Sequence, residues 1–92
     1  MWAQLLAAKC ENVKKNDTNR TAHTTARQLY AMVAPHAQLL DQNNVALSTT
    51  KISARLPITR LAHYTVLETF ARLDALAAGK HVPQLPNEPF DL

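Results

Sequence analysis

The sequence is poor in the residues on which many small folds depend, because its 92 residues include one cysteine, one glycine and five aromatic side chains. A single cysteine, Cys10, excludes an intramolecular disulfide bond. One glycine is too few for the turns of a hairpin-rich β protein, and it excludes a glycine-rich phosphate-binding loop. With so few aromatic side chains the core must consist mainly of Leu, Ala, Val and Ile. The abundance of Ala and Leu predicts an all-α protein.

The sequence also lacks a long apolar run. No segment approaches the roughly 20 apolar residues that a membrane-spanning helix requires. The first turns of the chain place apolar side chains before the lysines, which is the reverse of the charge order in a signal peptide. We therefore expect a cytoplasmic protein with no membrane partner.

Length and charge restrict the partners of the chain. A domain of this size buries only roughly 60 to 65% of the surface of its unfolded chain, which favours further stabilisation by a protein partner or a homodimer. Residues 1–80 hold all ten Lys and Arg and five acidic residues, a net charge of +5, while Glu88 and Asp91 are the other two acids. Such a basic body is typical of proteins that bind nucleic acid, and equally of an ordinary solvated surface.

Hydrophobic periodicity predicts two helical segments in the first half of the chain. Residues 2–15 place apolar side chains on one face and end in two lysines. Residues 16–23 read NDTNRTAH and predict a loop, so the second helix should begin near Thr24 and reach Asp41. Because Pro35 lacks an amide hydrogen and clashes with the preceding turn, we expect a kink there or two short helices.

A third helix is expected between two breaks in the pattern. Residues 41–44 read DQNN and predict a loop. Ser48 can cap a helix that ends near Leu56, because the residue before Pro57 avoids the helical conformation.

The longest helix is predicted over residues 60–78, with Thr59 as its N-cap and Gly79 as the left-handed residue at its end. Its predicted buried face comprises Val66, Leu67, Phe70, Leu73 and Ala77. Its predicted solvent face comprises Thr65, Glu68, Thr69 and Arg72. Residues 81–92 contain three prolines and predict an irregular, extended tail after a helical domain over residues 1–80.

Residues 50–67 read TKISARLPITRLAHYTVL, a short helix, a tight break and a second helix. The pattern resembles the helix-turn-helix of DNA-binding regulators, and its extension to about residue 79 is similar to the long recognition helix of winged-helix regulators. The residues that carry the resemblance are Ile52, Ser53, Leu56, Ile58 and Val66. The expected fold is a small bundle of four or five helices with a helix-turn-helix-like centre, in which residues 24–41 form the supporting helix.

The resemblance implies a small DNA-binding regulator whose second helix, from Thr59, enters the major groove of duplex DNA. In that arrangement Arg60 could contact guanine, while Lys51 and Arg55 would approach the phosphate backbone. The implied DNA-binding residues are Lys51, Arg55, Thr59, Arg60, Leu61, Tyr64 and Thr65. The alternative is that Leu61 and Tyr64 belong to the core and the basic side chains form a solvated face.

The competing hypothesis is a small helical protein-protein interaction module, such as a phage or plasmid accessory protein that binds a host or partner protein. Trp2, placed at an exposed end of the first helix, and Leu85 and Phe90 in the tail are candidate partner-binding residues. Alternatively, both terminal segments fold back and cover the small core.

The residue pattern gives little support for an enzyme. His23, His36, His63 and His81 show neither the spacing nor the cysteines of a zinc site. We therefore expect no catalytic residue, no metal and no cofactor. Cys10 is expected to be a small buried apolar residue, and a buried His63 would need hydrogen-bond partners for its ring.

Overall fold

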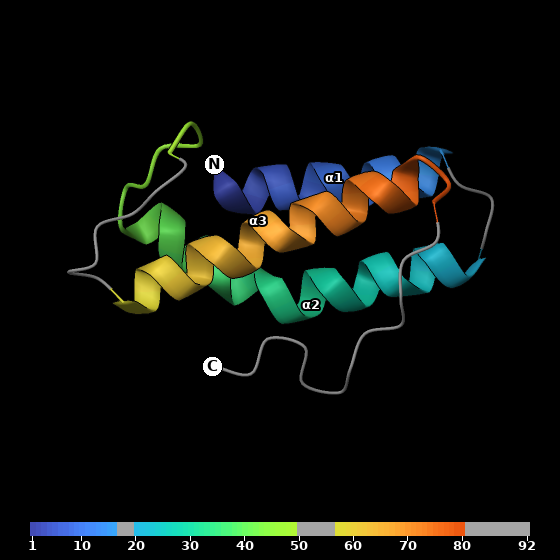
Figure 1. Ribbon diagram of the computed structural model, residues 1–92. Coiled ribbons are helices and arrows are strands. Elements are labelled where there is room, and N and C mark those ends of the chain that lie inside the picture. The colour runs from blue at the N-terminus through green and yellow to red at the C-terminus, as the bar shows by residue number, and fades with distance from the viewer. Residues whose placement is uncertain (17–19, 50–56, 81–92) are drawn as a thin grey trace.

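Three long helices form the protein in the computed structural model, which describes residues 1–16, 20–49 and 57–80. They are α1 (Trp2–Asn16), α2 (Arg20–Gln42) and α3 (Pro57–Ala77). α2 runs antiparallel to α1, and α3 returns in the direction of α1 (Figure 1). The all-α class is confirmed. The expectation of four or five helices is wrong, since the described residues form three.

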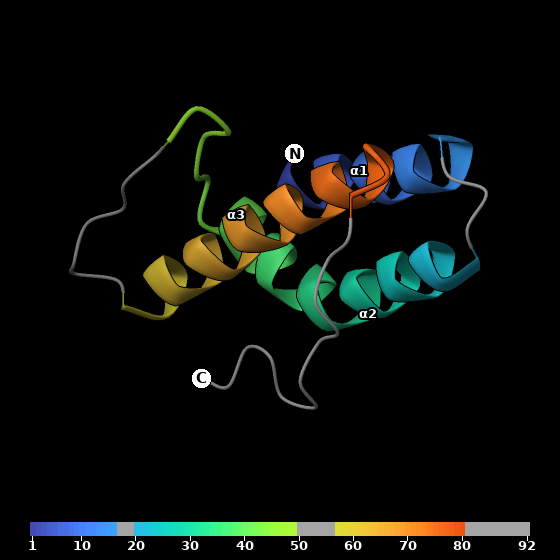
Figure 2. The same ribbon diagram turned by 45° about the vertical axis from the view of Figure 1, so that its right-hand side comes forward.

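The helices enclose one core, to which each contributes a single face. α3 begins beside the end of α2 and ends beside the end of α1 (Figures 1 and 2). Every pair of helices is in contact. The buried apolar side chains are Trp2, Leu6, Cys10, Val13, Ala22, Ala26, Leu29, Val33, Ala37, Leu40, Ala62, Val66, Phe70, Leu73 and Leu76.

α1 matches its predicted range to within one residue. Its buried positions recur at intervals of three and four residues, which places them on one face. Lys14 and Lys15 lie in its last turn, where cations stabilise a helix through its dipole. Cys10 is buried in this face, as expected, and its thiol donates a hydrogen bond to the carbonyl of Ala26 (3.6 Å).

α2 differs from its prediction at its start and at Pro35. It begins at Arg20, four residues before Thr24, so part of the predicted loop is helical. It also continues through Pro35 as one helix, and the predicted division into two short helices is wrong. Pro35 is exposed, while Val33 and Ala37 on either side of it are fully buried. Tertiary packing on both sides therefore holds the helix together where the local signal favours a break.

The predicted third helix lies mostly outside the described residues, which omit 50–56. Ser48, its expected N-cap, lies in a turn, and Thr49 is not helical. α3 itself begins at Pro57, where the missing amide hydrogen costs nothing because the first amides of a helix have no partner within it. The prediction that Thr59 caps α3 is therefore wrong: Thr59 lies inside the first turn and is buried.

Both α2 and α3 end in a left-handed residue that closes the last turn. Gly79 has φ 75°, with hydrogen bonds from its amide to Leu76 and from the Lys80 amide to Ala75. Asn44 has φ 57°, and the Val45 amide donates to Leu40. This is the Schellman arrangement in both cases, so the predicted role of Gly79 is confirmed. The loop predicted over residues 41–44 begins only at Asn43, because Asp41 and Gln42 belong to α2.

The faces of α3 were only partly predicted. Val66, Phe70 and Leu73 are buried as expected, but Leu67 is exposed. Thr65 and Thr69, assigned to the solvent face, are buried. The Thr69 hydroxyl donates to the carbonyl of Thr65 (2.9 Å), which satisfies the polar group inside the core.

Candidate interaction surface

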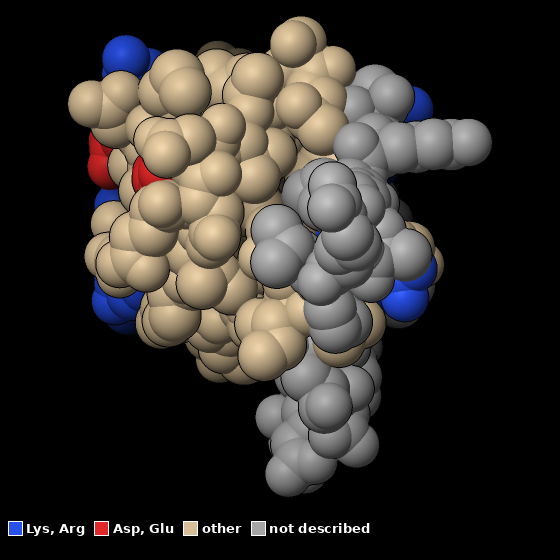
Figure 3. Space-filling view, turned by 90° about the vertical axis from the view of Figure 1, so that its left-hand side faces the viewer, with Lys and Arg blue, Asp and Glu red and all other residues tan. Residues whose placement is uncertain are grey.

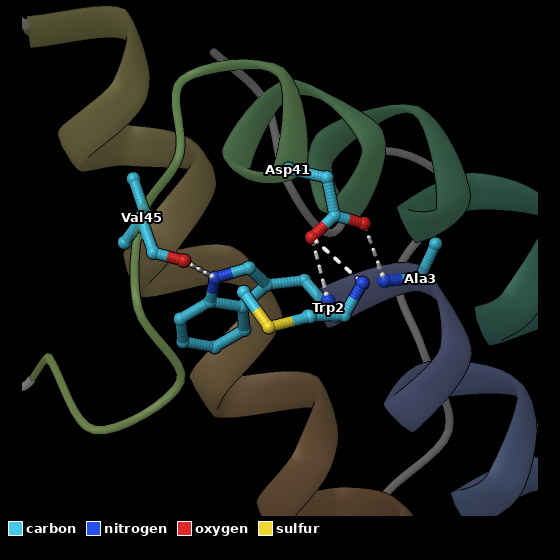
Figure 4. Close-up of polar contacts among 5 residues, drawn as sticks. Trp2, Ala3, Asp41 and Val45 are labelled. Carbon is cyan, nitrogen blue, oxygen red and sulfur yellow. Dashed lines mark hydrogen bonds and ion pairs between the residues drawn. The ribbon is translucent and has the colours of Figure 1, made fainter.

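Trp2 lies in the core of the bundle and not on its surface. Only 1% of the residue is exposed, so its predicted position at an exposed end of the helix is wrong, and α1 covers the core. The indole ring stacks on Phe70 and meets the edge of His63, with ring centroids 6.0 and 5.3 Å apart. Its Nε1 donates to the carbonyl of Val45 (2.7 Å; Figure 4). Trp2 thereby ties α1 to α3 and to the segment after α2.

Asp41, at the end of α2, caps the start of α1. Its carboxylate accepts hydrogen bonds from the backbone amides of Trp2 (2.7 Å) and Ala3 (3.1 Å), and lies 3.1 Å from the Met1 amino group (Figure 4). Burial alone would raise the pKa of Asp41, but these hydrogen bonds and the positive amino group outweigh it and lower the pKa below its usual value. The charged carboxylate therefore stabilises the folded state.

His63 is buried, and its ring finds a partner in the backbone. Its Nε2 lies 2.9 Å from the carbonyl oxygen of Thr49. Because a carbonyl only accepts, Nε2 carries the hydrogen in this pair. His63 therefore holds the segment after α2 against α3.

The residues predicted to contact DNA do not share one surface. Arg60, Leu61 and Tyr64 are exposed on α3, whereas Thr59 and Thr65 are only 4% and 3% exposed and face the core. The alternative placement of Leu61 and Tyr64 in the core is also wrong. Other predicted contact residues lie outside the described residues: Lys51, Arg55, Leu85 and Phe90.

An apolar stripe lies on the outer side of α3. We name it the α3 outer surface and define it by Ile58, Leu61, Tyr64 and Leu67, which are 70%, 44%, 68% and 39% exposed. Residues three apart are neighbours on a helix, so each member of the row adjoins the next. Each step of three residues also turns the row about 60° around the helix axis, so Leu61, Tyr64 and Leu67 lie on the outer side of α3 while Ile58 lies at its beginning, on the side opposite Leu67. The surface holds four of the seven large apolar side chains that are exposed in the described residues. Scattered exposed apolar residues are ordinary, whereas a run of them on one helix is a candidate interaction surface.

Two members of this surface were not predicted to belong to it. Ile58 was interpreted as an apolar residue beside a turn, and Leu67 as a core residue. The sequence did contain a sign that some of them are exposed: the segment of α3 has large apolar residues on every side, and a single buried face cannot accommodate all of them. Periodicity could not identify which of them remain exposed, because Thr59, Thr65 and Thr69 occupy buried positions of α3.

At the end of the bundle where α2 stops and α3 begins, charged side chains lie mainly near the edges of the described surface (Figure 3). Seen from the end where α2 stops and α3 begins, the described surface is largely uncharged, with acidic and basic groups near its edges (Figure 3). The acidic side chains of the described residues are all in ion pairs: Glu11 with Lys14, Asp41 with Met1, Glu68 with Arg72, and Asp74 with Lys9.

Neither a metal site nor a reactive thiol emerges from the described residues. No group of three or more His, Cys, Asp or Glu side chains among them could hold a metal ion. Burial raises the pKa of the Cys10 thiol and outweighs the nearby Lys14, which lowers it, while Glu11 adds a smaller rise. The thiol therefore stays protonated and poorly nucleophilic.

The helices of the described residues are each too short or too polar to cross a membrane. Comparisons with protein-family models, with curated proteins and with solved structures find no match to this chain.

Proposed function

We propose that the protein is a small helical protein-binding module whose contact surface is the α3 outer surface. The observation that carries the proposal is the exposure of Tyr64 and Ile58, each more than two-thirds exposed, beside Leu61 and Leu67 on the same helix. Exposed aromatic and aliphatic side chains gain most from burial at an interface, and tyrosine is among the residues that contribute most to binding energy. The buried Trp2 packs against His63 and Phe70 and so holds α3, the helix that carries these exposed side chains, in place.

The test replaces Tyr64 and compares a matched tyrosine on another helix. Tyr64→Asp places a charge at the centre of the α3 outer surface, whereas Tyr30→Asp places one on α2, where Tyr30 is 42% exposed. We expect Tyr64→Asp to abolish binding to a protein that purifies with the wild type, and Tyr30→Asp to retain it. Binding is then measured with the two purified proteins. Retention of every protein partner by Tyr64→Asp, including self-association, would overturn the proposal.

Binding to duplex DNA is a second candidate, favoured by basic side chains that have no acidic partner among the described residues. These exposed side chains are Lys15, Arg20, Arg27, Arg60 and Lys80. If α3 enters a groove of DNA, binding should weaken steeply with salt, and Arg60→Ala should relax sequence preference by about 1 to 3 kcal/mol. Lys51→Ala should weaken binding to all sequences equally. Unchanged mobility of duplex DNA at low salt would exclude this function.

A further inference from the structure

We infer that the occupant of the α3 outer surface in the free protein is the chain's own tail, residues 81–92, which a protein partner must displace. The inference rests on the proposed function, because it concerns the same surface. The tail lies outside the described residues, and its point of attachment, its reach and its side chains carry the inference.

Small side chains line α3 between Tyr64 and the point where the tail begins. Positions seven, eleven and fourteen residues after Tyr64 lie within about 40° of it around the helix axis. These positions are occupied by Ala71, Ala75 and Ala78, of which the first and last are exposed and the second is half-buried. A chain that turns back at the end of α3 can therefore lie close against the helix on its way to Tyr64, between Leu67 on one flank and Glu68 on the other.

The tail is long enough to reach Tyr64. Gly79 has φ 75° and the Lys80 amide donates to the carbonyl of Ala75 (2.9 Å), an arrangement in which the chain stops advancing along the helix. Tyr64 lies sixteen residues before Lys80, about 24 Å along the helix. The ten residues from 81 to 90 span about 31 Å in the polyproline II conformation, so Phe90 reaches Tyr64 with about two residues left for the turn.

The composition of the tail suits docking on a helix. Pro83, Pro86 and Pro89 recur at the three-residue period of polyproline II, a conformation that has no internal hydrogen bonds. The side of a helix offers no free backbone groups, so a segment that needs none suits it better than a β-strand does. Proline-rich segments of this kind bind proteins on aromatic side chains, and Tyr64 is an exposed aromatic residue.

The large apolar side chains of the tail match the surface in position. When Phe90 lies at Tyr64, which is 68% exposed, it covers the tyrosine ring. Leu85 then lies about 16 Å nearer the end of α3, level with the segment between Ala71 and Ala75. The tail therefore places its leucine over the smallest side chains of α3 and its phenylalanine beside the aromatic one.

Charge favours the same direction of the tail. Arg60 is exposed and has no acidic partner among the described residues, and Asp91 comes within its reach. Glu88 is level with the ion pair of Glu68 and Arg72 (3.1 Å), whose opposite charges cancel. The docked tail thus gains one ion pair without placing two unpaired acids together.

Nuclear magnetic resonance of the full-length chain tests the docking. We expect nuclear Overhauser contacts between the rings of Tyr64 and Phe90, and these contacts should persist on dilution because they form within one molecule. The amide signals of the tail should shift in Tyr64→Ala and stay in place in Tyr30→Ala, the matched substitution on α2. Unchanged tail signals in Tyr64→Ala, or contacts that disappear on dilution, overturn the inference.

A charge swap tests the direction of the tail. Arg60→Glu and Asp91→Arg each place like charges together and should weaken the contacts between the two rings by about half or more, while the double variant should restore them. Arg27→Glu makes the same charge change on α2 and should leave the contacts unchanged. A double variant with contacts no stronger than those of either single variant contradicts this direction.

Partner binding separates this inference from the proposed function. Phe90→Ala should tighten binding of the protein partner about threefold or more, because the tail competes less for the surface. Weaker partner binding by Phe90→Ala overturns the inference, since the tail would then belong to the binding site. If the tail does not dock but Tyr64→Asp loses its partner, only the inference is wrong. If the tail docks and Tyr64→Asp keeps every partner, the proposed function is wrong. Circular dichroism of each variant confirms that it is folded.

Discussion

At the scale of single residues, the first amides of α1 are capped by a carboxylate from another helix. α1 has no acidic residue in its first turn, and Asp41 of α2 satisfies the amides of Trp2 and Ala3 instead. Such a cap stabilises the start of α1 and its docking on α2 together. Its removal should therefore loosen a tertiary contact as well as one helix end.

We predict that Asp41→Asn lowers the free energy of unfolding at pH 7 by about 1 kcal/mol, within the range known for lost caps. Because the folded pKa of Asp41 is lowered, its contribution is present above the unfolded pKa of about 3.9 and is lost as the pH falls through the folded value. Urea unfolding at pH 7 and at successively lower pH measures both effects, and the difference between the variant and the wild type should shrink as the pH falls. Asp74→Asn is the control, since its exposed ion pair with Lys9 should contribute less. Equal losses for the two variants would contradict the assignment.

Phe70 should be the most costly single truncation in α3. It is 7% exposed and stacks on Trp2, and the amino group of Lys9 lies 5.4 Å from its ring centroid. We predict that Phe70→Ala costs about 3 to 5 kcal/mol, because it leaves a cavity at the contact of α1 and α3. Tyr64→Ala, an exposed aromatic on the same helix, should change stability by about 0.5 kcal/mol or less. Thermal melting measures both variants. Equal shifts of the melting temperature in Phe70→Ala and Tyr64→Ala would show that Phe70 is not part of the core.

At the scale of the helix, α2 contains a proline that its packing tolerates. Pro35 is exposed, removes one backbone hydrogen bond and crowds the preceding turn. We predict that Pro35→Ala raises the free energy of unfolding by about 1 to 3 kcal/mol. Pro57→Ala is the control: at the first position of α3 proline is favourable, so alanine should give no gain. Denaturant unfolding of the two variants makes the comparison, and a loss of stability in Pro35→Ala would mean that the ring has a packing role.

The helices show what local sequence could and could not predict. The range of α1 and the end of α3 at Gly79 were predicted, because both depend on local periodicity and on the conformation of one residue. The continuity of α2 through Pro35 was not, because residues far along the chain hold it. Thr69 can be buried because its hydroxyl donates a hydrogen bond to a carbonyl of its own helix. Hydrophobic periodicity treats threonine as a polar residue and therefore predicted that it is exposed.

The candidate surface was predicted in part for a similar reason. The sequence pattern predicted that Arg60, Leu61 and Tyr64 contact DNA and therefore lie on the surface. All three side chains are exposed. It could not identify Leu67 as their neighbour, because α3 carries apolar residues on both faces. Only the packing of α1 and α2 decides which face is buried.

At the scale of the whole molecule, the ends of α1 and α3 and the start of α2 lie at the same end of the bundle (Figure 1). Lys15, Arg20 and Lys80 lie near this end without acidic partners among the described residues. Arg20 is also the first residue of α2, where the helix dipole disfavours a cation. The arrangement should cost stability through repulsion among the three helix ends.

We predict that Arg20→Glu raises the free energy of unfolding by about 0.3 to 1 kcal/mol at low salt, since it relieves repulsion and suits the dipole. Arg20→Gln should give a smaller gain, because it only removes the charge. Both gains should shrink at high salt, where exposed charges are screened. Urea unfolding at low and high sodium chloride measures them, and a gain that is independent of salt would point to a different cause.

The position of Trp2 gives the protein a built-in optical probe. It is the only tryptophan in the chain, and it contacts α3 through Phe70 and the segment after α2 through Val45. Its emission should lie at short wavelength while all three helices are assembled and shift to the red when water reaches the indole. Separation of α1 from α3 and release of the segment at Val45 would both alter this one signal. Tryptophan fluorescence can therefore follow the assembly of the whole bundle without an added label.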